Sequence, residues 1–512
     1  MSLFNGAVLF KNERLKMYKK SSTWVLMCII LLLVALMVIF SNLSQYSMKV
    51  YQEEWQEQYK RLLADAKNQL GTNPEDPYNN KMSDTLSYLL EHDINPYDWR
   101  TDAVDDYFSL KHNIYGQNSY GIRKPGEIID QDFNDFYLEK PAEADIDPAR
   151  LQERMDKLWA IITKNDWKSY IGMKIDDLKS DYGQSENKGE RDVEIEIYEL
   201  YLEKNIVPIS EVTHYYSGFD QPELMWKSKQ IQLIRESKLN LLQGEDQSGA
   251  MYTRTQLKNF ENDIKIAQER LSTNSPPVTS DSFLGMLEQS DSSLGLITIL
   301  MVVYSANLFA SEYGSGTIKM LLITPHKRNK IFRAKLGLLL EMSLISMGIV
   351  FIISFIINAA FTGFKGIGAM QILYVFGNMI RLPYLLYIFV RYLILMLPVI
   401  AYSSLALVLS VITRKSAVSI TVTLLLLFTS DLFVMLMTLP NGGTAVPGAK
   451  FLIFANTSLQ YYLPSAQSAY GGMYYFTVDE TMTLGFSVTV LLVHIICFLW
   501  TAHDDFCRRD VK

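Results

Sequence analysis

Long apolar segments recur along this 512-residue chain and are separated by polar stretches of very different length. About 20 residues of α-helix cross a hydrocarbon core of roughly 30 Å, so each segment is long enough to span a membrane. The six segments are Trp24–Phe40, Leu294–Ala310, Leu344–Phe361, Tyr392–Thr413, Ala417–Leu439 and Leu484–Trp500. A soluble protein would have difficulty burying so many long apolar runs. The pattern therefore predicts six transmembrane helices, the first an uncleaved anchor because its apolar stretch is too long for a signal peptide.

The long polar stretch after the first apolar segment has the periodicity of helices. Apolar residues recur every three or four positions in residues 53–70, 148–164, 223–242 and 256–271. The run Val193–Tyr198 alternates as a strand would, but a three-to-four spacing continues beyond it and favours a helix. We therefore expect a mainly helical inserted domain.

Two similar stretches, "LLEHDINP" (Leu89–Pro96) and "YLEKNIVP" (Tyr201–Pro208), have the pattern of a helix end. Asp93 or Asn205 can adopt the left-handed conformation, the next isoleucine folds back on the helix, and proline prevents its continuation. The likeness indicates either two related subdomains or one common capping pattern used twice.

These patterns predict an all-α polytopic membrane protein with six transmembrane helices and a large, mainly helical extracytoplasmic domain between helices 1 and 2. The expected parts are an amphipathic interfacial helix (1–20), transmembrane helix 1 (21–43), the extracytoplasmic domain (44–290), transmembrane helix 2 (291–311), a cytoplasmic segment (312–335), and transmembrane helices 3–6 with short loops (336–512).

Charge is distributed in agreement with this division. Residues 44–290 hold 45 acidic and 28 basic side chains, a net charge of −17, whereas the whole chain has a formal net charge of −7. Lys and Arg cluster at every second boundary of the apolar segments, namely before the first, between the second and third, between the fourth and fifth, and after the sixth. The positive-inside rule then predicts that both termini are cytoplasmic and that residues 44–290 lie outside the plasma membrane.

Several kinds of site are not indicated by the sequence. Cys28, Cys497 and Cys507 all lie outside the acidic stretch, which excludes a disulfide-stapled outer domain. We find no His or Cys pattern at metal-ligand spacing, no hydrolase arrangement, and no G-x-x-x-x-G-K-[ST] loop for nucleotide phosphates. The acidic composition argues against nucleic acid as a partner. We expect no catalytic residue, no cofactor and no metal.

The stretch Ser305–Lys335 leaves one apolar segment and enters the next through a Gly-containing turn, a short apolar run and six basic residues. Such a segment is expected to lie along the inner membrane surface, tied to two transmembrane helices. In most membrane proteins a basic interfacial loop only fixes the topology.

The residues of this stretch resemble the E…GT…LL…P…R…I…K signature of ABC-2 type permeases, the membrane subunits of one class of ATP-binding-cassette exporters. The matching positions are Glu312, Gly316, Thr317, Leu321, Leu322, Pro325, Arg328, Ile331 and Lys335. The basic start "LFKNERLKMYKK" and the stretch "SLALVLSVITRKSAVSI" are also similar to that family. A large outer domain between the first two spans is similar to a Gram-positive branch of it.

The resemblance implies a role for each matching position. Glu312, Gly316, Thr317, Leu321 and Pro325 would shape the element that contacts an ATPase, and Arg328 and Lys335 would anchor it. It also implies the partners: a separate ABC ATPase subunit and a second permease copy or homologous permease, within the lipid bilayer. The chain itself would not be an enzyme, because ATP would be hydrolysed by the partner subunit.

Two charged residues fall within apolar segments. Arg391 lies near the outer end of the fourth and Asp431 in the outer third of the fifth. Because an unpaired charge in the hydrocarbon region costs several kcal/mol, we expect the two to pair or to line a cargo path.

The sequence thus favours a permease subunit that exports a peptide, a lipid-linked substrate, a drug or an ion. The alternative is a membrane-anchored sensor, receptor or scaffold with an extracellular ligand-binding domain. Such a receptor needs only one or two spans, so six spans favour transport. An ion channel is disfavoured because no filter-like loop is present.

Overall fold

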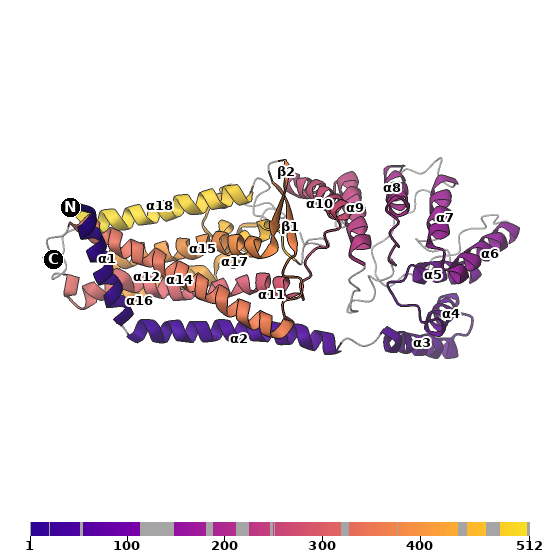
Figure 1. Cartoon of the computed structure of the whole chain (residues 1–512), viewed down its shortest axis with the longest axis horizontal. Coiled ribbons are helices and arrows are strands. Elements are labelled where there is room, and N and C mark those ends of the chain that lie inside the picture. Colours follow the sequence, from indigo (N-terminus) through magenta and orange to yellow (C-terminus); the bar gives the residue numbers. More distant parts are fainter. Residues whose placement is uncertain are drawn as a thin grey trace. The chain divides into compact units, whose positions relative to one another are not determined.

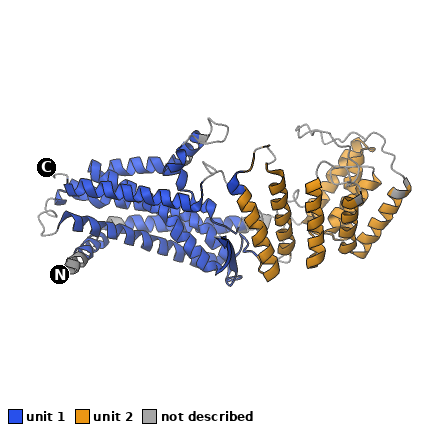
Figure 2. Cartoon of the chain, turned by 90° about the horizontal axis from the view of Figure 1, so that it is seen from above, with its two compact units in different colours: residues 1–45, 253–256, 277–512 blue, residues 46–252, 257–276 orange. Residues whose placement is uncertain are grey.

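The computed structural model describes residues 2–19, 21–51, 55–112, 148–180, 188–210, 225–245, 249, 251–318, 327–375, 377–438, 448–466 and 482–508 (Figure 1). The chain divides into two compact units (Figure 2). Unit 1 comprises residues 1–45, 253–256 and 277–512, and unit 2 comprises residues 46–252 and 257–276.

Unit 1 is a bundle of long apolar helices. In order along the chain its elements are α1 (Ser2–Lys19), α2 (Ser21–Tyr51), α11 (Phe283–Gln289), η3 (Ser290–Ser293), α12 (Leu294–Gly314), α14 (Arg328–Thr362), β1 (Met370–Val375), β2 (Asn378–Pro383), α15 (Tyr384–Thr413), α16 (Ser416–Phe428), α17 (Ser430–Thr438), η5 (Ala449–Phe451), η6 (Phe454–Asn456), η7 (Leu459–Tyr462) and α18 (Leu484–Arg508).

Within the described part of the chain, five helical stretches are long and apolar enough to cross a membrane. They are Trp24–Gln45, Phe283–Gly314, Arg328–Thr362, Tyr384–Thr413 and Leu484–Arg508. The remaining expected span is divided at Thr429 into α16 and α17, of 13 and 9 residues. Six spans therefore remain a prediction, since neither of these two helices reaches spanning length alone.

Two helices form the centre of unit 1. The most apolar windows of the stretches containing α12 and α15 are 61% and 72% buried, against 22–28% for those of α2, α14 and α18. The central helices approach closely because small residues line their contact: the Ser410 hydroxyl of α15 donates to the carbonyl of Ala306 on α12 at 2.6 Å. The three peripheral helices leave apolar faces uncovered, as expected for helices that face lipid.

A β-hairpin interrupts the helical pattern between α14 and α15. Strands β1 and β2 pair antiparallel, with Met370 opposite Pro383 and Val375 opposite Asn378. Gly377 in the connection has φ of 85°, a conformation that glycine adopts without steric cost. The sequence analysis placed only a short loop here, so the hairpin is a finding of the structure.

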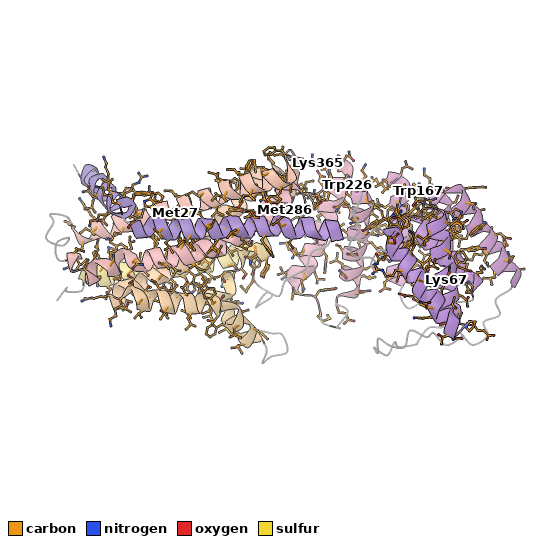
Figure 3. All side chains as sticks on the ribbon, turned by 90° about the horizontal axis from the view of Figure 1, so that it is seen from below. Met27, Lys67, Trp167, Trp226, Met286 and Lys365 are labelled. Atoms are coloured by element: carbon orange, nitrogen blue, oxygen red, sulfur yellow. The ribbon has the colours of Figure 1, made fainter. Side chains whose placement is uncertain are left out.

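Unit 2 consists of helices, as the periodicity predicted. They are α3 (Trp55–Thr72), α4 (Pro77–Glu91), α5 (Arg100–Lys111), α6 (Pro148–Lys164), α7 (Trp167–Ser180), α8 (Lys188–Lys204), α9 (Trp226–Gln243) and α10 (Arg254–Thr273). The alternating run Val193–Tyr198 is helical and lies in α8. One apolar core is built from α3 to α7 and another from α8 to α10, and Trp167 packs against both (Figure 3).

The two predicted helix stops are confirmed. Asp93 and Asn205 have φ of 51° and 52°, and the next amides, of Ile94 and Ile206, donate back to carbonyls five residues earlier at 2.9 and 3.1 Å. Asn165 and Asn274 end their helices in the same way, so the cap alone does not mark a repeat. The two helix ends that precede prolines are related in another way. The segments that follow them are joined by an isolated antiparallel β-bridge between Asp98 and Ile209.

Candidate functional site

Lys335 is a buried charge in α14, and its side chain is only 2% exposed. Its ammonium group lies 3.0 Å from Glu312 Oε1, 3.1 Å from Glu13 Oε2 and 2.9 Å from the carbonyl of Leu308. Helices α1, α12 and α14 therefore meet at one cation. Because an unpaired ammonium in such a place would be very costly, these contacts are needed for Lys335 to remain charged.

A second lysine completes this group of charges. Lys16 Nζ lies 3.3 Å from Glu13 Oε1 and 3.6 Å from Glu312 Oε1, and its side chain is 60% exposed. We refer to Glu13, Lys16, Glu312 and Lys335 as the Lys335 cluster. Its two carboxylates and two ammonium groups balance, although Glu312 Oε2 has no hydrogen-bond partner among the described residues.

The signature stretch has both of its end residues in this cluster. Glu312 and Lys335, its first and last positions, are in direct contact. Gly316 has φ of 72°, where a side chain would be strained, and the Thr317 and Ser315 hydroxyls are 2.8 Å apart. Arg328 begins α14 and donates to the carbonyl of Cys507 at 3.4 Å. Ile331 is buried in α14. Leu321, Leu322 and Pro325 lie outside the described residues.

Helix α1 contributes contacts that sequence reasoning missed. Glu13 was not identified as a site residue, yet it is 6% exposed and contacts Lys335 directly. Arg14 makes a second link from α1 to α14, through Glu341 at 2.8 Å. A signal was present, because Glu13 is the sole acidic residue in the basic helix α1. An isolated acid in such a helix suggests a buried cationic partner.

Arg391 in α15 is the second buried cation among the described residues of unit 1. Its Nε atom donates to Asp291 Oδ2 at 2.6 Å, and its NH1 atom donates to the carbonyls of Leu463 and Pro464 at 3.2 and 3.1 Å. The same NH1 atom lies 3.4 Å from Glu288 Oε1. In Figure 1, α11, which carries Glu288, lies at the end of the bundle opposite α1.

Glu288 has two hydrogen bonds besides its contact with Arg391. Its Oε2 atom accepts from the Tyr384 hydroxyl at 2.5 Å and from the amide of Ala466 at 3.0 Å. The side chain is 3% exposed, and Oε1 has no hydrogen-bond partner among the described residues. We refer to Glu288, Asp291 and Arg391 as the Arg391 cluster. If both acids are ionised, it holds one negative charge in excess.

The expected partner of Arg391 was Asp431. The structure gives Arg391 the partners Asp291 and Glu288, neither of which the sequence analysis named. Asp431 lies in α17, and its side chain is not among those that the structure describes. A contact between the two therefore remains a prediction.

Neutral polar side chains link helices near the Arg391 cluster. The Asn42 amide on α2 donates to Asn358 Oδ1 on α14 at 2.7 Å, and the Asn358 amide donates to the Ser290 hydroxyl at 3.0 Å. All three side chains are buried. These bonds satisfy polar groups that would be costly between apolar helices.

Unit 2 has a pocket whose lining includes Trp99, Tyr170, Tyr198 and several charged side chains. Lys174 and the Tyr170 hydroxyl both donate to Asp106, at 2.5 and 2.9 Å, and Arg235 binds Glu194 through two nitrogens. Burial raises the pKa of Asp105, which Lys81 at 2.8 Å only partly opposes. Asp105, Asp106 and Glu194 thus each have a cationic partner within unit 2. No group of three potential metal ligands occurs among the described residues of the chain.

Comparison with known proteins covers mainly unit 1. Residues 267–512 match a family model described as "Protein of unknown function (DUF2705)". The chain is 28% identical over 234 residues to "Uncharacterized membrane protein YdbK" of Bacillus subtilis (strain 168), covering 46% of this chain and 85% of that protein. It is 25% identical over 257 residues to "Uncharacterized protein YhcI" of the same organism, covering 49% of this chain and 76% of that protein. With its five apolar helices and this similarity, the chain is a membrane protein.

Proposed function

We propose that the chain is the permease subunit of an ABC-2 type exporter, driven by ATP that a separate subunit hydrolyses. The contact between Glu312 and Lys335 carries the proposal. These residues stand at the two ends of the signature stretch, one in α12 and the other in α14. Their buried ion pair joins the two ends of the segment between them. Both ends are therefore held at one place in the bundle, which we call the base of the segment.

A segment held in this way can transmit force. Its two ends continue into α12, which is central in the bundle, and α14, which is peripheral. A partner that moves the segment would displace α12 and α14 together, because the Lys335 cluster prevents them from separating there. Glu13 extends the same base to α1. Displacement of this base would shift the bundle between inward- and outward-facing states, and two permease copies would enclose the cargo path.

The proposed orientation places the Lys335 cluster at the cytoplasmic end. This orientation follows from the Lys and Arg clusters at every second end of the apolar segments and from the acidic stretch 44–290. They predict a plasma-membrane protein whose termini are cytoplasmic and whose unit 2 is extracytoplasmic. The cargo belongs to one of four classes: peptide, lipid-linked molecule, drug or ion.

Purification from native membranes tests the proposal. We expect an ABC ATPase to co-purify with the wild-type chain and to be lost from Thr317→Trp, because Thr317 is exposed at the start of the segment. Thr501→Trp is the matched control: Thr501 is an exposed threonine on α18, outside the segment, and its variant should retain the ATPase.

Two outcomes would contradict the proposal. One is the absence of any nucleotide-hydrolysing partner from the wild-type chain. The other is retention of the ATPase by Thr317→Trp at the wild-type level. Recovery of a kinase in place of an ATPase would favour the alternative of a membrane-anchored sensor.

A further inference from the structure

The hydrogen bonds of the Arg391 cluster are distributed unequally between its two acids. Asp291 accepts a hydrogen bond from Arg391 at 2.6 Å. Glu288 Oε1 accepts none from described residues, although Arg391 NH1 lies 3.4 Å away, because that nitrogen donates to the carbonyls of Leu463 and Pro464. The guanidinium thus neutralises Asp291 and leaves Glu288 without a counter-charge of its own.

A buried carboxylate without its own counter-charge is unstable. As a whole residue Glu288 is 2% exposed, which places it among the least exposed charged residues that the structure describes. Transfer of an ionised carboxylate into such a place costs far more than transfer of the neutral acid, so the group takes up a positive charge. One positive charge is sufficient, since the cluster holds two acids and one guanidinium.

The surroundings of Glu288 favour a proton over a metal ion. The charged and titratable groups that face the cluster among the described residues are Asp291 from η3 and Tyr384, Tyr387, Arg391 and Tyr392 from α15. Helix α14 contributes the neutral Asn358, through Ser290, and residues 463–466 contribute carbonyls and an amide. An alkali-metal ion at Oε1 would have Arg391 nitrogen in its coordination shell, whereas a proton adds no volume and needs no shell.

From this geometry we propose that Glu288 is a proton-binding site in the helix bundle and that the protonated acid holds α11 against α15 and residues 463–466. In this state Oε2 keeps its bonds from Tyr384 and Ala466, and Arg391 keeps Asp291. Release of the proton to water leaves one buried negative charge in excess. The cluster then opens, and this end of the bundle loosens. The proposal is independent of the transport function proposed above.

Infrared spectroscopy of the purified full-length chain tests the site directly. At neutral pH we expect a carbonyl band from a protonated carboxylic acid that is lost in Glu288→Gln and retained in Asp84→Asn, a control in unit 2. Asp291→Asn should lose the band too, because one acid then faces one guanidinium and Glu288 can stay ionised. Thermal unfolding provides a second readout. Glu288→Gln should unfold near the wild-type temperature, because glutamine imitates the neutral acid, while Arg391→Met should unfold well below it, because both acids then lose their cation.

The dependence on pH and on salt completes the test. The wild-type chain should become less stable as the pH rises from the ordinary glutamate pKa of about 4 to the pH at which Glu288 releases its proton, and Glu288→Gln should lose this dependence. Absence of the band from the wild-type chain, or its retention in Glu288→Gln, would overturn the proposal. So would specific stabilisation by sodium over choline at constant pH that Glu288→Gln abolishes, since the bound cation would then be a metal ion.

Discussion

The Lys335 and Arg391 clusters both contain a buried cation, but they differ in whether their charges balance. Each buries a cation between two carboxylates where helices of unit 1 meet. In the first, Lys16 approaches both carboxylates and balances the charge. In the second, no further cation contacts the acids among the described residues. Each cluster has one carboxylate oxygen without a hydrogen bond in the described part of the chain, so the clusters differ in charge balance and not in hydrogen bonding. A balanced cluster can serve as a permanent link between helices, whereas an unbalanced one responds to protons.

The clusters also differ in the helices that they join. The Lys335 cluster joins α1, α12 and α14, the elements around the proposed ATPase-contacting segment. The Arg391 cluster joins α11, η3, α15 and residues 463–466. The Lys335 cluster is thus a permanent link between helices, whereas the Arg391 cluster responds to protons. Four substitutions test this difference.

Arg391→Met should have the largest effect. The substitution removes the sole cation seen between Glu288 and Asp291 and leaves two buried acids facing each other. Breaking a buried ion pair in this way typically costs about 3–5 kcal/mol of the free energy of unfolding. Denaturant unfolding in detergent would measure it, with Arg333→Met on the exposed face of α14 as a control expected to change stability by about 0.5 kcal/mol or less.

Lys335→Met should cost less, about 3 kcal/mol, because Lys16 remains close to both carboxylates. Adding Glu13→Gln should recover part of the loss, since the double variant again has equal numbers of charges. A double-mutant cycle measures this coupling. If Lys335→Met proved more damaging than Arg391→Met, charge balance would not be what distinguishes the clusters.

Lys16→Met should convert the balanced cluster into an unbalanced one. Its direct cost should be below about 1 kcal/mol, because the Lys16 side chain is 60% exposed. The variant should nevertheless become more stable as the pH is lowered, since Glu13 or Glu312 would then take up a proton. Thermal unfolding at several pH values measures this, and a profile identical to that of the wild type would refute the role assigned to Lys16.

Asp84→Asn in unit 2 should have the smallest effect and sets the lower limit of the comparison. Burial alone would raise the pKa of Asp84, but hydrogen bonds from Lys111 at 2.8 Å and His112 at 3.0 Å outweigh it and lower the pKa. The pair therefore stabilises the fold above the ordinary aspartate pKa of about 4, and this contribution is lost as the pH falls through the lower value.

Because the Asp84 side chain is 38% exposed, the contribution should stay below about 1 kcal/mol. Hydrogen exchange of the α4 and α5 amides, compared between wild type and Asp84→Asn at neutral and acidic pH, would measure it. A loss as large as that of Arg391→Met would show that burial does not decide the strength of these pairs.

Local features were determined by the sequence alone. Helical periodicity predicted the helices of unit 2, and the capping residues predicted the left-handed positions at Asp93 and Asn205. Apolar length predicted membrane helices, five of which the structure describes at spanning length. These features depend on residues only a few positions apart, so a short stretch of sequence contains all the information that they require.

Only the tertiary structure decided which charges meet. Glu13 reaches Lys335 across 322 positions of sequence, and Arg391 binds Asp291, which lies 100 positions earlier in the chain. The hairpin of β1 and β2 likewise depends on a backbone pairing that its composition did not indicate. The physical reason is the same in each case. A buried charge or strand requires a partner. The nearby sequence shows that a partner is needed but not which residue it is, because that depends on how distant parts of the chain pack.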